Sequence, residues 1–121
     1  MHISELVHDA YRHASQSGFH DHSPSRVELD ALQGSDWIGL KLALIHSEVT
    51  EALEVIRDGH PPAERRFEED RGKPIGFDSE LADIVIRVAD LAGACGIDLE
   101  KAIKEKLAYN RGRKHMHGKA F

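Results

Sequence analysis

A long stripe of apolar residues in the middle of the chain ends at helix-breaking residues. Apolar side chains recur at alternating four- and three-residue spacings between Ile38 and Ile56. This repeat matches the roughly 3.6-residue period of an α-helix, so the segment is expected to form an amphipathic helix. Ser35 or Asp36 can cap its start, and Gly59, followed by two prolines, ends it. The stripe consists of Ile38, Leu42, Ile45, Val49, Ala52 and Ile56.

Three more helices are expected from the same reasoning. One covers residues 4–17, and another begins near Asp78 or Ser79 and ends at Gly96. Asp98 can cap the last helix, which carries lysines on its outer face. The chain therefore predicts an all-α fold of the four-helix-bundle type.

The remaining segments are expected to be loops within a single domain that covers residues 1–121. Residues 19–34 can include a turn of helix around 27–32, and residues 60–77 are polar and interrupted by proline. The predicted helices carry more apolar surface than one small monomer can bury. We therefore expect oligomerisation, to a homodimer or a homotetramer, to complete the bundle.

Composition narrows the class of protein further. The chain is 40% hydrophobic and 31% charged, as ordinary globular proteins are. Its single cysteine, Cys95, excludes an intramolecular disulfide and a cysteine-rich zinc site. No apolar run approaches the roughly 20 residues that span a bilayer, and no signal sequence is read at the N-terminus. We expect a cytoplasmic protein without a membrane partner.

The net charge of −5 is distributed unevenly. Residues 101–121 carry a charge of +6, and residues 1–100 carry −11. The acidic body would repel nucleic-acid phosphates, so a nucleic-acid partner is not expected. The basic end can stay extended and solvated, or it can fold back and hold a small anion that the acidic part binds through a metal ion.

Two pairs of carboxylates supply that acidic site. Glu48 and Glu51 lie three residues apart in the middle of one predicted helix, and Glu80 and Asp83 have the same spacing in another. This spacing places both members of a pair on one helix face. Antiparallel packing of the two helices can bring the pairs together, and a hard cation would relieve their repulsion. An all-oxygen site favours Mg²⁺, with Mn²⁺ as the alternative.

These two motifs resemble a known family. The segments LALIHSEVTEALE at 42–54 and ELADIVIRV at 80–88 are similar to the ExxE and ExxD signature of MazG-like nucleoside triphosphate pyrophosphohydrolases. The 28 residues between Glu51 and Glu80 are at the long end of that family's spacing. The segment KLAYNRGR at 106–113 resembles a branch of short, single-domain members. The resemblance covers residues 36–119.

The resemblance implies an all-α, oligomeric enzyme that hydrolyses a nucleoside triphosphate to a monophosphate and pyrophosphate with Mg²⁺. It implies Glu48, Glu51, Glu80 and Asp83 as metal ligands, with Glu48 or Glu51 orienting the attacking water. The substrate phosphates require positive or hydrogen-bonding side chains. The candidates are Lys41, Lys106, Asn110, Arg113 and Lys114.

Other readings stay open. Trp37, the only tryptophan, can stack on a base or close the core. The histidines near the N-terminus, including His20, are expected at the surface, as is Asp90. The chain can also be a relative that acts on dUTP, dCTP or phosphoribosyl-ATP. The alternative from another class is a non-catalytic helical module that binds a nucleotide, a metal ion or a partner protein.

Overall fold

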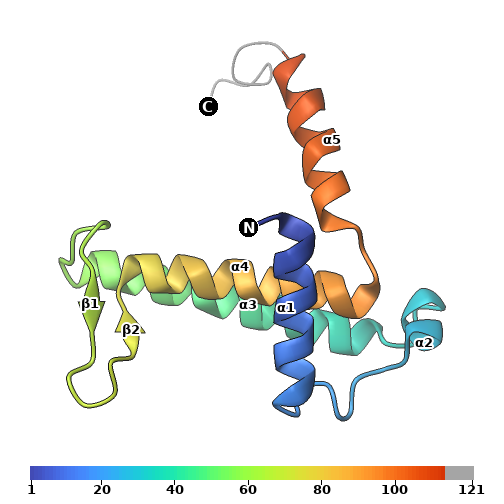
Figure 1. Cartoon of the computed structure of the whole chain (residues 1–121), viewed down its shortest axis with the longest axis horizontal. Helices are drawn as coiled ribbons and strands as arrows, with labels where there is room; N and C mark the ends of the chain where they lie inside the picture. The colour runs from blue at the N-terminus through green and yellow to red at the C-terminus, as the bar shows by residue number, and fades with distance from the viewer. Residues whose placement is uncertain (114–121) are drawn as a thin grey trace.

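The computed structural model describes residues 1–113, and this part of the chain is mainly helical (Figure 1). The all-α class is therefore confirmed. The described elements comprise five helices and two short strands. They are α1 (Ile3–Gln16), α2 (Arg26–Asp30), α3 (Ser35–Arg57), β1 (Arg66–Phe67), β2 (Pro74–Ile75), α4 (Phe77–Cys95) and α5 (Leu99–Arg111).

Helices α3 and α4 form an antiparallel pair along the long axis of the molecule (Figure 1). The strands β1 and β2 pair at one end of this layer, with Arg66 opposite Ile75. The expectation of a plain loop over 60–77 is thus wrong in this detail. Gly72 has a left-handed φ of 65°, which lets the chain turn back between the strands. The hairpin returns the chain so that α4 runs beside α3.

Helix α1 crosses α4 at a steep angle (Figure 1). Small side chains on α4 allow this close approach: Ala89 is fully buried, and Gly93 lies against Tyr11 of α1. A Cβ atom at Gly93 would lie 2.6 Å from the Tyr11 Cβ atom, which is too close for two carbon atoms. The contact between α1 and α4 therefore depends on glycine at this position.

Most of the predicted helix caps and helix ends are present in the structure. Asp98 caps α5 by accepting a hydrogen bond from the Lys101 amide at 3.1 Å, as expected. Gly96 ends α4 in the left-handed conformation. The cap expected for α3 is wrong, because Gly34 occupies the N-cap position and α3 already begins at Ser35. The turn of helix expected around 27–32 is present as α2.

Helix α5 extends away from the α3–α4 layer and contacts α1 (Figure 1). Among the helices of residues 1–113, only α3 and α4 lie side by side along their lengths, so the complete four-helix bundle stays a prediction. Large apolar side chains remain exposed on both helices of the pair, among them Leu53 and Val85. Between residues 1 and 113, no helix has the length and apolar character needed to cross a bilayer.

Candidate functional site

Three of the four predicted metal ligands meet between α3 and α4. Glu48 projects from α3, while Glu80 and Asp83 project from α4. One carboxylate oxygen from each residue lies within 4.8 Å of the other two. The three-residue spacing on α4 places its two acids on one helix face, and the antiparallel pairing brings Glu48 opposite them. These three residues are the acidic cluster.

Glu48 is the buried member of the acidic cluster, with 7% of its surface exposed. The Arg87 Nε atom donates a hydrogen bond to Glu48 Oε1 at 2.8 Å. Burial acts to raise the pKa of Glu48, but the Arg87 hydrogen bond and charge, with the adjoining Glu51 and Glu80 carboxyl groups, outweigh it and lower that pKa. Glu48 is therefore ionised and already neutralised by a cation from the chain itself.

Glu80 has the opposite electrostatic character. Burial, the adjoining Glu48 carboxyl group and the negative charges of Glu51, Glu48 and Asp83 raise the pKa of Glu80 to about 7. Its Oε2 atom is buried and has no hydrogen-bond partner among residues 1–113. A buried oxygen without a partner is costly. A metal ion at this position would both satisfy the oxygen and displace the proton.

Glu51 lies beside the acidic cluster rather than in it. Its side chain is exposed, and it is absent from the group of oxygens that lie within 4.8 Å of one another. Its charge nevertheless reaches Glu80 and contributes to the raised pKa of that residue. Three carboxylates, one of which has a buried oxygen without a hydrogen-bond partner, can hold a hard divalent cation, and the Glu51 carboxyl group adjoins Glu48 at the side of this cluster.

A cavity of about 490 Å³ adjoins the acidic cluster. Glu48 and Asp83 form part of its wall, and Arg87 and Lys41 contribute positive charge. Trp37 also lines the cavity, with the Lys41 ammonium 5.3 Å from its ring centroid. This volume lies within the range of small-molecule sites. Trp37 and Lys41, which were predicted to bind the base and the phosphates, therefore line the same cavity as the candidate metal ligands Glu48 and Asp83.

The other predicted phosphate-binding residues lie elsewhere. Lys106, Asn110 and Arg113 are on or just after α5, and none of them lines the cavity. The Lys106 ammonium and the Arg113 guanidinium lie 5.7 and 5.6 Å from the ring centroid of Tyr109. Lys114 falls outside the described residues. Within one described chain, α5 therefore does not bring its positive charges to the acidic cluster.

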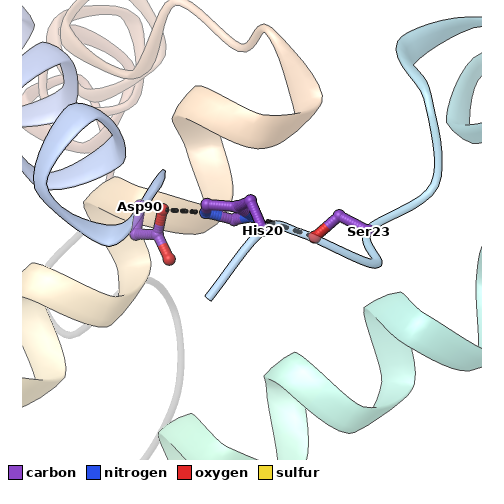
Figure 2. Close-up of polar contacts among 3 residues, drawn as sticks. All are labelled: His20, Ser23 and Asp90. Atoms are coloured by element: carbon purple, nitrogen blue, oxygen red, sulfur yellow. Dashed lines mark hydrogen bonds and ion pairs between the residues drawn. The ribbon is translucent and has the colours of Figure 1, made fainter. Parts of the chain in front are cut away.

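His20 occupies a position that sequence reasoning missed. Its expected place at the surface is wrong, because only 7% of its side chain is exposed. Figure 2 shows the imidazole between Asp90 of α4 and Ser23, with Nε2 2.6 Å from Asp90 Oδ1 and Nδ1 2.9 Å from Ser23 Oγ. A carboxylate only accepts, so Nε2 donates to Asp90. The ring centroid lies 4.8 Å from Tyr11 and 6.0 Å from Trp37.

These contacts attach the loop that follows α1 to the wall of the cavity. Asp90 lines the cavity and lies seven residues after Asp83, two turns further along α4 on nearly the same face. That spacing was the only sequence signal for Asp90, and nothing local identifies His20 as its partner. Arg87 was also missed, although its position one turn after Asp83 placed it near the acidic pair.

The fold and the site together define an all-α protein with an acidic, metal-competent cluster beside a cavity of small-molecule size. Comparisons with protein-family models, with curated proteins and with solved structures found no match. Function is therefore inferred from the chemistry of the residues and from the motif resemblance.

Proposed function

We propose that the protein is a Mg²⁺-dependent nucleoside triphosphate pyrophosphohydrolase that acts on the nucleotide pool of the cytoplasm. The observation that carries the proposal is the convergence of Glu48, Glu80 and Asp83 beside a cavity that also holds Trp37 and Lys41. Carboxylates that bind a divalent cation, next to an aromatic side chain and positive charges, suit a nucleotide with its phosphates. The paired motifs are the ones that resemble the MazG-like family.

The four acidic residues would have two distinct roles in the reaction. Glu48, Glu80 and Asp83 would hold the metal ion, which supplies charge stabilisation at the phosphoryl oxygens when bound. Glu51, whose side chain is exposed beside the cluster, would orient the water and accept its proton. The water oxygen bonds to the α-phosphorus, the bridging bond between the α- and β-phosphates breaks, and pyrophosphate leaves with the electron pair.

The cavity would hold the rest of the substrate. Trp37 offers an aromatic face for the base, and Lys41 offers positive charge for the phosphates. Lys106, Asn110 and Arg113 stay candidates for phosphate binding in a homodimer or homotetramer, where α5 of a second copy can approach the cavity. Oligomer formation would also cover the apolar faces that α3 and α4 expose.

A pyrophosphate-release assay tests the reaction class. The panel comprises the common nucleoside and deoxynucleoside triphosphates, oxidised forms, dUTP, dCTP and phosphoribosyl-ATP, each with Mg²⁺, Mn²⁺ or EDTA. We expect metal-dependent release of a monophosphate and pyrophosphate. Absence of release from every substrate by folded protein with metal bound would reject the enzyme and favour a non-catalytic binding module.

Two variants link the activity to the residues. Asp83→Asn is expected to lower kcat/KM by about a hundredfold or more through loss of a metal ligand, and Glu51→Gln by about a hundredfold through loss of the base. Only Asp83→Asn should also weaken Mn²⁺ binding measured by calorimetry. Glu54→Gln is the matched control, because Glu54 is exposed on α3 and pairs with Arg57. Wild-type turnover in either test variant would show that the assignment is wrong.

A further inference from the structure

Arg87 is the basic side chain in direct contact with the acidic cluster. It lies one turn after Asp83 on α4, and its Nε atom donates to Glu48 Oε1 at 2.8 Å. A guanidinium group has five N–H donors in a planar fork. Among residues 1–113, the bond to Glu48 engages one of them. The Arg87 side chain is 42% exposed, whereas that of Glu48 is 10% exposed, so the unused donors can meet a ligand.

The partner of Arg87 is also a predicted metal ligand. A divalent cation binds carboxylate oxygens directly and carries twice the charge of a guanidinium. It therefore competes with Arg87 for the Glu48 carboxylate. Arg87 also lines the cavity, so a guanidinium released from Glu48 would remain beside any molecule bound there. Arginine forks match the oxygens of phosphate groups in pairs, which makes an anionic ligand the natural second partner.

The described lysines that were considered for phosphate binding, Lys41 and Lys106, do not contact the acidic cluster in the way that Arg87 does. Lys41 lines the cavity but lies over the Trp37 ring, and Lys106 and Arg113 lie beside Tyr109 on or after α5. Neither of these two lysines has a described ion pair with the acidic cluster. Arg87 alone among the described basic residues contacts both a candidate metal ligand and the cavity.

We infer that Arg87 is an exchangeable counter-ion: it neutralises Glu48 in the metal-free protein and binds a phosphate group of a metal–triphosphate ligand in the loaded protein. The ligand class rests on the proposed function, but the exchange itself does not depend on turnover. This assignment adds an anion-binding residue on α4 to the cavity and makes metal binding and phosphate binding mutually favourable. The metal ion frees the guanidinium, and the phosphate keeps it away from Glu48.

Binding measurements on three variants test the exchange. Arg87→Gln removes the charge at similar length, Arg87→Lys keeps the charge but loses the planar fork, and Arg57→Gln is the control in an exposed pair with Glu54. Without nucleotide, Arg87→Gln should bind Mn²⁺ about fivefold more tightly, because one competing positive charge is gone. With Mg²⁺ present, it should bind inorganic triphosphate about tenfold or more weakly. Arg87→Lys should lie between these values, and Arg57→Gln should match the wild type.

The affinities of Arg87→Gln for Mn²⁺ and for inorganic triphosphate together test the exchange. Unchanged or weaker Mn²⁺ binding by Arg87→Gln would show that the guanidinium does not compete for Glu48. Unchanged triphosphate binding would show that Arg87 does not contact the anion. Failure of the wild type to bind inorganic triphosphate would overturn the ligand class. In contrast, triphosphate binding without turnover of any nucleotide would overturn the proposed enzyme and leave the exchange intact.

The wild-type protein provides a measurement that needs no folded variant. The Arg87 Nε–H group can be followed by ¹⁵N–¹H NMR, with the signal assigned in the wild type through the covalent bonds that join it to the Arg87 backbone. Addition of Mg²⁺ with inorganic triphosphate should shift this signal, whereas triphosphate with EDTA should not. A signal that is unmoved by the complete mixture at saturation would overturn the exchange.

Discussion

Glu80 connects metal binding to pH at the level of a single residue. Its pKa is raised to about 7 because burial, the adjoining Glu48 carboxyl group and the surrounding negative charges favour the protonated form. A metal ion can use both oxygens of this side chain only after the proton leaves. Below pH 7 we therefore expect Mn²⁺ affinity to fall by about tenfold for each pH unit, through this group. Calorimetry between pH 5.5 and about 8 measures this slope.

The same proton affects the stability of the metal-free protein. Between the ordinary pKa of Glu80 near 4.5 and its raised value near 7, the native state binds more protons than the unfolded chain does. This carboxyl group therefore lowers the free energy of unfolding as the pH rises through that window, and the effect levels off above it. Thermal melts of the wild type and Glu80→Gln should diverge across the window. Parallel melting curves would show that the Glu80 proton is not bound in the native state.

At the level of elements, the packing of α1 on α4 depends on a missing side chain. An added Cβ atom at Gly93 would lie 2.6 Å from the Tyr11 Cβ, so the two helices would have to separate. We expect Gly93→Ala to lower the free energy of unfolding by about 1–2 kcal/mol, because overpacking exceeds the gain in helix propensity. Chemical denaturation measures the change.

Gly39 provides the matched control for that substitution. It is also helical, but an added Cβ atom would meet nothing within 4 Å. Gly39→Ala should therefore raise the free energy of unfolding by about 0.5–1 kcal/mol through helix propensity alone. Changes of the same sign in both variants would mean that the contact between α1 and α4 does not constrain Gly93.

At the scale of the molecule, few apolar side chains of residues 1–113 are buried, and many large ones remain exposed. The fully or nearly buried apolar side chains are mainly alanines, and no large side chain among the described residues is completely buried. On α3, Leu42, Val49 and Ile56 recur every seven residues and remain exposed, with Leu53 beside them. Such a stripe is typical of a helix that packs against a further helix.

We therefore predict that this surface is buried in a homo-oligomer. Sedimentation velocity should give a mass of two or four times 13.5 kDa for the wild type. Leu53→Glu should shift the population to the monomer while the helical circular dichroism is retained, because a charge cannot be buried there without a partner. Val27→Glu, at an exposed apolar site on α2, should leave the mass unchanged. A monomeric wild type at micromolar concentration would show that the predicted oligomer is wrong.

Local sequence patterns were sufficient to predict the main helices and the acids that share a helix face. The apolar period and the glycine and proline breaks located α1, α3, α4 and α5, and the three-residue spacing placed Glu80 and Asp83 together. Both properties depend on local backbone geometry, which neighbouring residues control. The hairpin at 66–75 escaped prediction because two-residue strands carry no periodic signal.

Which of these residues come into contact depends on the packing of the helices. Arg87 reaches Glu48 across 39 residues, and His20 reaches Asp90 across 70. The packing also positions Glu51 at the side of the acidic cluster, and it positions α5 so that none of its residues lines the cavity. Such contacts depend on how each helix is rotated about its axis and on the angle at which it crosses its neighbour. Small residues such as Gly93 influence that angle because they determine how closely a helix distant in sequence can approach. Periodicity identifies the face of a helix, but the packing partner determines what that face contacts.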